Sequence, residues 1–294
     1  PLRHALPTAR AGASAGPFAP PSRRAAGGPV PGRIAGTAPP GGADGRGWPF
    51  GRPVQSGLYR MAVGDDRWEL VWSDEFEYNG LPDAEKWAYD VGGHGWGNQE
   101  LQYYTANRPE NARVQDGTLT IEARKELWEN RPYTSARLVT RGKADWLYGR
   151  FEIRARLPKG RGSWPAIWML PTAWNVGSGN WPDVGEIDIM EHVGFNPDVV
   201  HATVHTRAYY HSIGTQRTAT VVVPTARTAF HTYAVEWTPD EIRAFIDDSL
   251  YFSFANERAT NPQADYRQWP FDRPFHLLLN IAVPITGSQQ QSKK

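Results

Sequence analysis

The sequence contains no cysteine in its 294 residues, and that absence removes several kinds of site. Disulfide-stapled scaffolds, cysteine-ligated zinc sites and iron–sulfur clusters all require thiols. The sequence also lacks any apolar run approaching the ~20 residues that cross a bilayer, and its mean hydropathy of −0.57 excludes a membrane-spanning helix. Glycine-rich phosphate loops and a serine nucleophile elbow are absent as well.

Acidic residues are scarce at the start of the chain. Residues 1–60 contain eleven prolines, eleven alanines, twelve glycines and eight arginines, and Asp44 is their only acid. Such a segment buries too little apolar surface to offset the entropy of ordering it, so we expect residues 1–60 to be disordered and to contribute nothing to stability or catalysis. They are either a flexible basic linker or upstream sequence that is not native. They hold no apolar stretch of the ~7–15 residues typical of a secretion signal.

The charges of the whole chain nearly cancel, with 32 basic and 31 acidic residues. The net charge of +1 gives no support for a nucleic-acid partner, and the arginines of residues 1–60 come without the lysine clusters of a polyanion-binding tail. We therefore expect no nucleic-acid partner. We also expect a monomer that does not bind a membrane.

Residues 61–294 are long enough for one large domain, and their pattern is that of an all-β protein. Apolar and polar residues alternate with a period of two, which indicates strands with one buried face. Turn signals separate the segments, and no helix longer than a turn or two is indicated. The expected fold is a two-sheet antiparallel β-sandwich of jelly-roll type. The expected strands are Trp68–Trp72, Thr118–Arg124, Arg137–Arg141, Phe151–Leu157, Ala166–Leu170, Glu186–Glu191, Val199–Thr206, Thr218–Val223, Thr232–Trp237, Ile242–Asp247, Leu250–Phe254 and Phe275–Val283.

Three acids interrupt one apolar strand, at Glu186, Asp188 and Glu191. Carboxylates in such a setting are costly unless they are used or paired. On a regular strand Glu191 would point away from the other two, and one bulged residue would return all three to one face. We expect Met190 to occupy the extra position. Three convergent carboxylates suit a retaining glycosidase, whereas the alternative is a set of surface acids on an edge strand.

The segment Glu-Ile-Asp-Ile-Met-Glu at 186–191 resembles the active-site strand of glycoside hydrolase family 16, in its bulged laminarinase-like branch. Six further segments match the family in order and together span about residues 66–283. They are 72–76 (WSDEF), 96–105 (WGNQELQYYT), 133–138 (YTSARL), 162–170 (GSWPAIWML), 201–205 (HATVH) and 279–283 (LNIAV).

The resemblance implies a role for each acid and for several neighbours. Glu186 resembles the nucleophile and Glu191 the acid/base, which must hold a proton at rest and lose it once the charge of Glu186 is neutralised. Asp188 is expected to hydrogen-bond the nucleophile, or to be a structural carboxylate. In addition, five substrate-binding residues are implied: Asn98, Arg137, Trp164, Trp168 and His205.

These binding residues have plainer alternatives. Trp164 and Trp168 share one face of a strand-like run and are expected to stack on sugars, but core packing would explain them too. Asn98 and Arg137 are expected to bind hydroxyls, or to be surface or turn residues. His201 and His205 have the spacing of a zinc pair, but the run between them reads as strand and no third ligand is evident. The family resemblance instead implies that His205 faces the cleft.

The family resemblance indicates a secreted, retaining endo-β-1,3-glucanase whose partner is a β-glucan polysaccharide and whose catalysis needs no cofactor. Two alternatives remain open. One is another family 16 hydrolase, acting on mixed-linkage glucan or a marine galactan. The other is a glucan-binding lectin on the same fold, although a pure binder has no need of Glu191.

The end of the chain departs from the family pattern. After residue 283 the family usually continues to a final alternating strand, whereas residues 284–294 are short and polar. We therefore expect the domain to lack its final strand and to be less stable than its relatives. The same departure puts a structural calcium in doubt, because the family often draws one ligand from that strand.

Overall fold

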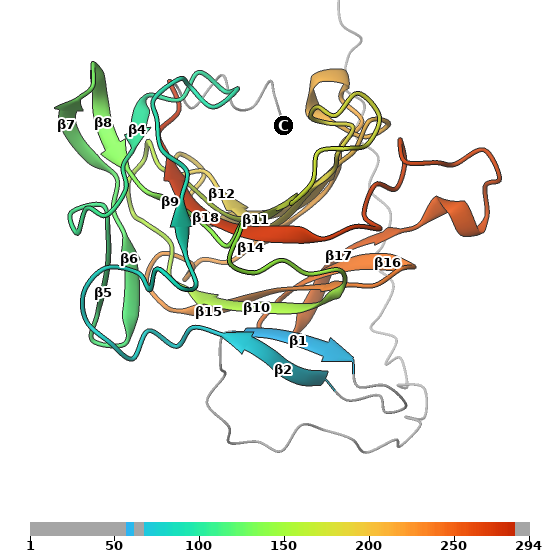
Figure 1. Ribbon diagram of the computed structural model, residues 1–294, viewed down its shortest axis with the longest axis horizontal. Coiled ribbons are helices and arrows are strands. Elements are labelled where there is room, and N and C mark those ends of the chain that lie inside the picture. The colour runs from blue at the N-terminus through green and yellow to red at the C-terminus, as the bar shows by residue number, and fades with distance from the viewer. Residues whose placement is uncertain (1–56, 62–67, 286–294) are drawn as a thin grey trace, which may run out of the picture. The chain divides into compact units, whose positions relative to one another are not determined.

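The computed structural model describes residues 57–61 and 68–285, which belong to one compact unit of the chain. These residues form two large antiparallel sheets stacked face to face, with two small sheets beside them (Figure 1). Their helical content is two single 3-10 turns, η1 (His211–Ile213) and η2 (Glu257–Ala259). None of the helices in this part of the chain could span a membrane. The two-sheet antiparallel sandwich is therefore confirmed.

The two large sheets contain six and seven strands. Across the six-stranded sheet the order is β17 (Ser249–Ala255), β16 (Glu241–Ile246), β15 (His231–Trp237), β10 (Gly149–Ala155), β1 (Gly57–Met61) and β2 (Trp68–Ser73). Across the seven-stranded sheet it is β14 (Arg217–Val222), β13 (Val199–His205), β12 (Glu186–His192), β11 (Trp164–Pro171), β18 (Phe275–Ala282), β9 (Arg137–Val139) and β3 (Ala88–Tyr89). The small sheets are β4 (Gln102–Tyr104), β8 (Arg131–Ser135) and β7 (Arg124–Trp128), and the pair β5 (Ala112–Gln115) and β6 (Thr118–Ile121).

The core lies between the two large sheets, and aromatic side chains from the two sheets contact each other across it. Trp237 of β15 packs edge-on against Phe275 of β18, with ring centres 5.2 Å apart, and both side chains are fully buried. Every residue of β18 is buried, because this strand runs between β11 and β9 and is covered on both faces. A continuous apolar run is what such a central strand requires.

The strands expected from sequence agree with the structure to within two residues at each end, with one exception. The alternating segment 118–124 was expected to be one strand. It is instead divided after Ile121, because β6 pairs with β5 while the next strand, which begins at Arg124, pairs with β8. Alternation continues across the break, so periodicity did not reveal the change of sheet.

Strand β1 corrects the prediction that all of residues 1–60 are disordered. Gly57–Met61 pairs with β10 on one side and with β2 on the other, so it is an internal strand of the six-stranded sheet. Leu58 lies opposite Phe151, and the Leu58 side chain is only 2% exposed. Burial of the Leu58 side chain and backbone pairing on both sides offset the entropy lost when β1 becomes ordered. The rest of the proline- and glycine-rich segment has too few apolar side chains for us to expect the same of it.

Two other predictions about the chain ends fall outside the described residues. The disorder expected for residues 1–56 concerns a segment that the structure does not describe. The missing final strand was expected within residues 284–294, of which only Pro284 and Ile285 are described, and neither is in a strand.

We predict that removing β1 destabilises the protein. A chain that begins at Met61 loses the buried Leu58 side chain and leaves β10 and β2 without their shared partner. Loss of a buried leucine alone costs about 2–5 kcal/mol, which lowers the Tm of a domain of this size by roughly 4–20 °C. The measurement is thermal unfolding by circular dichroism. A chain that begins at Pro53 keeps β1 and is the control; equal Tm values for the two truncations would contradict the prediction.

A second prediction comes from His276, which is fully buried in β18. Burial and the nearby charge of Arg141 lower its pKa to about 4 from the ordinary 6.5, and neither ring nitrogen meets a hydrogen-bond partner among the described residues. As the pH falls below 6.5 the unfolded chain takes up the proton and the folded chain does not, so folding stability falls between pH 6.5 and 4. The loss from this residue is up to about 1.4 kcal/mol per pH unit.

The measurement is urea unfolding at pH 7 and at pH 4.5 for the parent and for His276→Gln. The variant should lose less stability than the parent over this interval, because its side chain does not titrate. An identical loss in both proteins would show that other groups cause the acid sensitivity.

Candidate active site

A bulge in β12 places the three acids on one face of the seven-stranded sheet. Asp188 lies opposite Thr203 of β13, and Glu191 lies opposite His201, so three steps along β12 match two steps along its partner. One extra residue on one strand shifts the alternation by one position. Glu186, Asp188 and Glu191 therefore share the face directed away from the core, as the sequence predicted.

The occupant of the extra position is a correction. Met190 was expected there, but Met190 pairs with Ile167 of β11 and Asp188 pairs with Trp168, which leaves Ile189 without a counterpart on that strand. Ile189 and Met190 are both fully buried in the core. The bulge thus sends two successive apolar side chains inward and returns the next carboxylate to the outer face.

Each of the outer two acids accepts a hydrogen bond from an indole. Trp164 Nε1 donates to Glu191 Oε1 at 3.0 Å, and Trp181 Nε1 donates to Glu186 Oε2 at 3.1 Å. Asp188 and Glu191 are buried, with 4% and 7% of their surface exposed, and Glu186 is half-buried. Two fixed donors and limited contact with water orient the carboxylates before any substrate arrives.

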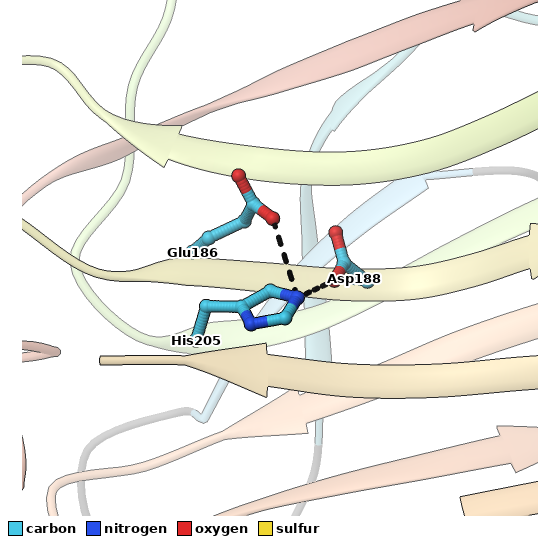
Figure 2. A group of neighbouring side chains, drawn as sticks. All are labelled: Glu186, Asp188 and His205. Atoms are coloured by element: carbon cyan, nitrogen blue, oxygen red, sulfur yellow. Dashed lines mark ion pairs between the residues drawn. The ribbon is translucent and has the colours of Figure 1, made fainter. Parts of the chain in front are cut away.

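His205 of β13 lies beside the first two acids, as Figure 2 shows. Its Nε2 is 3.7 Å from Glu186 Oε1 and 3.6 Å from Asp188 Oδ2. His205 is buried, and Trp181 packs against it with ring centres 5.5 Å apart. The structure therefore brings His205 to the acids, as expected. His205 lies there because it is directly opposite Glu186 where β12 pairs with β13.

The same three side chains are the one group in the described part of the chain whose ligand atoms converge as a metal site would. Ligand atoms of Glu186, Asp188 and His205 lie within 4.8 Å of one another. The group does not fit a structural calcium, which takes 6–8 oxygen ligands and not an imidazole nitrogen. His201, the other member of the zinc-like pair, is not part of the group.

Further along the same face, Arg137 is held between two indoles. Its guanidinium carbon lies 4.6 Å from the ring centre of Trp168 and 4.8 Å from that of Trp96. Asp90 fixes the other side of Arg137, with Oδ2 3.1 Å from Nε. Arg137 is only 8% exposed, so the plain surface alternative is wrong for it.

Trp168 is linked into a second set of contacts through Asn280 of β18. Trp168 Nε1 donates to Asn280 Oδ1 at 2.7 Å, and Asn280 Nδ2 donates to the Tyr104 hydroxyl at 2.9 Å. Trp168 also packs against a small apolar cluster that includes Leu278. Trp168 therefore both packs against apolar neighbours and donates a hydrogen bond to Asn280.

Asn98 lies in the loop that also carries Trp96. Its side-chain amide donates to Glu100 Oε1 at 3.3 Å. Burial raises the pKa of Glu100, while Gln102 and Asn98 donate hydrogen bonds that lower it and the charge of Arg137 lowers it further. The loop and Arg137 thus share one electrostatic environment, although Asn98 is half-buried and makes a contact typical of a turn.

Sequence reasoning missed Trp181 and Asn280. Trp181 lies in the irregular segment between β11 and β12, and its proximity to Glu186, five residues later, was the available signal. Asn280 lies within an apolar strand, where an amide is costly unless it is hydrogen-bonded. The amide was visible inside the segment 279–283 but was not assigned a role.

Comparison with known proteins agrees with this geometry. The family model of glycosyl hydrolases family 16 matches residues 99–293, a range that includes the whole acid-bearing strand. The chain belongs to glycosyl hydrolase family 16.

Relatives of this family 16 chain are close. A β-glucanase of Rhodothermus marinus is 72% identical over 235 residues, which are 78% of this chain and 82% of the relative. The X-ray structure of the laminarinase from Rhodothermus marinus aligns with a TM-score of 0.75 at 72% identity, covering 78% of this chain and 91% of that chain. A crystallised variant of SCLam, a non-specific endo-β-1,3(4)-glucanase, aligns with a TM-score of 0.71 at 44% identity, covering 80% and 92%.

We predict that Trp181→Phe lowers kcat on laminarin, the β-1,3-glucan indicated by the family resemblance, by about 10- to 150-fold. The substitution removes one hydrogen bond to a carboxylate, worth about 1.5–3 kcal/mol, and retains an aromatic ring. Trp174→Phe is the matched control, because Trp174 is 45% exposed in the same segment. The measurement is reducing-sugar release at saturating substrate, with Tm recorded for each protein. Equal kcat values for the two variants would contradict the role assigned to Trp181.

Proposed function

We propose that this chain is an endo-acting β-1,3-glucanase of the laminarinase type that hydrolyses its substrate by double displacement with net retention. The observation that carries the proposal is the bulged strand β12, which presents Glu186, Asp188 and Glu191 together on one face. Family membership and 72% identity to the Rhodothermus marinus β-glucanase support the activity.

In the first step Glu186 acts as the nucleophile. Its carboxylate attacks the anomeric carbon while Glu191 donates its proton to the departing glycosidic oxygen, and the product is a glycosyl ester of Glu186. The Trp181 N–H donates to Oε2 of Glu186, and His205 Nε2 lies 3.7 Å from Oε1, so both oxygens of the carboxylate have a neighbouring group that orients them toward the sugar. The Trp164 N–H likewise positions Glu191 through Oε1.

In the second step Glu191 reverses its role. Having lost its proton, it accepts one from a water molecule whose oxygen attacks the anomeric carbon, and Glu186 departs as a free carboxylate. Two inversions leave the β configuration unchanged. The short spacing of a retaining pair, about 5–5.5 Å between carboxyl groups, is the arrangement that this mechanism requires.

Asp188 and His205 act on the nucleophile in this proposal. His205 Nε2 lies almost equally far from Glu186 and Asp188, so the imidazole and the two carboxyl groups form one electrostatic cluster. Asp188 is nearly fully buried, which strengthens its electrostatic influence on its neighbours. We assign both residues to tuning and orienting Glu186 rather than to bond making.

Trp168, Arg137, Asn98 and Asn280 form the proposed sugar-binding part of the same face. Aromatic rings cover the apolar CH faces of sugars, while amide and guanidinium groups bind their hydroxyls. Arg137 and Trp168 are mutually fixed by stacking, so little side-chain entropy is lost when substrate binds.

A second activity is favoured by one observation. The related SCLam enzyme is described as acting on β-1,3(4)-glucan, so mixed-linkage glucan is the alternative substrate for this chain. A binding-only lectin is disfavoured, because burial of the carboxyl groups of Asp188 and Glu191 is costly and brings nothing to a pure binder. We also propose that the enzyme acts outside the cell as a monomer, where a polymeric glucan is accessible.

Retention is the prediction that tests the mechanism. Proton NMR of the earliest products from laminarin should show the β-anomer, with the α-anomer appearing later by mutarotation. Glu186→Ala and Glu191→Ala should each lower kcat by several orders of magnitude. Azide should partly rescue Glu191→Ala on an activated substrate and yield the β-azide, because the glycosyl ester can still form.

Glu186→Ala is the matched control, since it lacks the nucleophile and cannot yield the same product. Initial release of the α-anomer would overturn the assignment of a retaining pair. If the enzyme hydrolysed mixed-linkage glucan but not laminarin, the proposed β-1,3-glucan substrate would be wrong and mixed-linkage glucan would be the substrate.

A further inference from the structure

A second pocket lies beside the hairpin formed by β7 and β8. It is an open hollow of about 540 Å³, within the ~300–1,000 Å³ typical of small-ligand sites. Its lining combines two aromatic residues, Tyr103 and Trp128, with the polar side chains of Asn107 and Glu110. None of the residues assigned above to catalysis or sugar binding takes part in this lining.

Strand β4 separates this pocket from the active-site face. Successive residues of a strand point to opposite sides. Tyr104 is directed to Asn280, whose amide donates to the Tyr104 hydroxyl, whereas the preceding Tyr103 lines the pocket. The pocket is therefore a separate site and not an extension of the row that contains Trp168 and Arg137.

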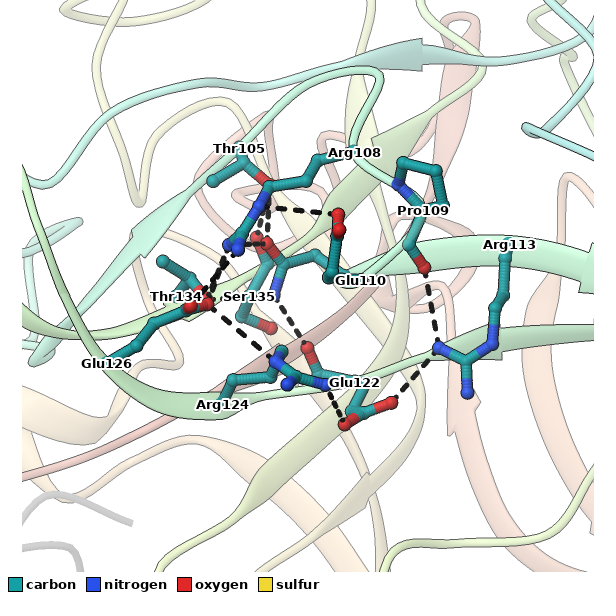
Figure 3. A network of polar contacts seen from close by, with 11 residues as sticks. Thr105, Arg108, Pro109, Glu110, Arg113, Glu122, Arg124, Glu126, Thr134 and Ser135 are labelled. Atoms are coloured by element: carbon teal, nitrogen blue, oxygen red, sulfur yellow. Dashed lines mark hydrogen bonds and ion pairs between the residues drawn. The ribbon is translucent and has the colours of Figure 1, made fainter.

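Arg108 fixes Trp128 from one side. The guanidinium carbon of Arg108 lies 4.8 Å from the centre of the Trp128 ring, while 39% of Trp128 remains exposed. Arg108 is itself immobile, since its two terminal nitrogens donate to both oxygens of Glu126 at 2.6 and 3.0 Å (Figure 3). The hydrogen bond from Arg108 lowers the pKa of Glu126 to about 2, so the pair stays ionised at any pH at which a glycosidase works.

The backbone around Trp128 is equally well defined. Trp128 lies opposite Arg131, and the two residues between them, Glu129 and Asn130, have φ values of 46° and 60°. Two left-handed residues in succession make the tight two-residue turn that matches the twist of a hairpin. Trp128 is thus a partly exposed aromatic residue on a stiff support, and binding to it costs little ordering entropy.

We propose that this pocket is a second binding site for the neutral polysaccharide substrate, with Trp128 and Tyr103 stacked on sugar rings. The inference rests on the proposed function. Sugars present apolar CH faces to aromatic rings and hydroxyls to polar groups such as Asn107 and Glu110. An anionic ligand does not fit, because Arg108 is neutralised by Glu126 and the remaining charged side chains in the lining are acidic.

The site matters for long chains and not for short ones. A glucan that reaches both sites is held by two contacts, and the second contact forms at the high effective concentration set by the first. A tetrasaccharide bound on the active-site face is separated from the second pocket by β4, so in this proposal its turnover does not involve Trp128. The pocket should therefore increase affinity for polymer and leave turnover of oligosaccharides unchanged.

The test is affinity electrophoresis in native gels that contain laminarin, with every protein carrying Glu186→Ala to prevent hydrolysis. Trp128→Ala should weaken binding to the polymer by about tenfold or more. Leu127→Ala is the matched control, because Leu127 is 80% exposed on the same hairpin and is not part of the pocket. Trp128→Tyr keeps an aromatic ring and should retain most of the affinity.

In otherwise unmodified enzyme, Trp128→Ala should raise KM for laminarin several-fold and leave kcat/KM for a β-1,3-linked tetrasaccharide within twofold of the parent. Equal retardation of Trp128→Ala and Leu127→Ala would overturn the inference. A parallel fall in tetrasaccharide kcat/KM would also overturn it, because it would show a structural role. If the parent binds laminarin through Trp128 but does not hydrolyse it, the proposed function fails while the second site stands.

Discussion

A single register shift in β12 determines how the rest of the site is built. The outer face of β12 must carry three carboxylates, although Glu191 is an odd number of residues from the other two. The inner face must fill the core without leaving a cavity. The bulge meets both demands, because Ile189 and Met190 fill successive core positions while Glu191 returns to the side of Glu186. Tyr251 of the opposite sheet contacts the bulge across the core, since its hydroxyl donates to the Ile189 carbonyl at 3.4 Å. Catalytic spacing and core packing are thus two results of one backbone irregularity.

Around this strand, aromatic side chains contribute polar contacts as much as apolar area. The indole N–H groups of Trp164 and Trp181 donate to the outer acids, and the rings of Trp96 and Trp168 enclose the Arg137 guanidinium. Fixed dipoles and stacked cations replace the water that would otherwise surround these charges, which is the arrangement that electrostatic catalysis requires. The high tryptophan content of the chain therefore reflects its site as well as its core.

Much of this could be predicted from the sequence, and the failures have physical causes. Period-two alternation located strands such as β10, and the spacing of the acids required a bulge. Its position could not be read, because Ile189 and Met190 are both apolar and only the pairing with β11 distinguishes them. Strand β1 was missed because proline and glycine dominate the composition around it, while the burial of Leu58 depends on partners far along the chain. Trp181 was missed because its target is set by the path of an irregular segment.

The internal position of β1 also affects how the protein emerges from the ribosome. Leu58 leaves the exit tunnel shortly before β2, with which it pairs, but its other neighbour, Phe151, follows roughly ninety residues later. At about 5–20 residues per second the first hairpin waits several seconds with one edge open. Pairings at such long separation make folding slow, and an open edge invites association between nascent chains. Among the described strands β1 therefore emerges first and must wait for its second partner, and a host whose chaperones bind nascent chains should give a higher soluble yield of this enzyme.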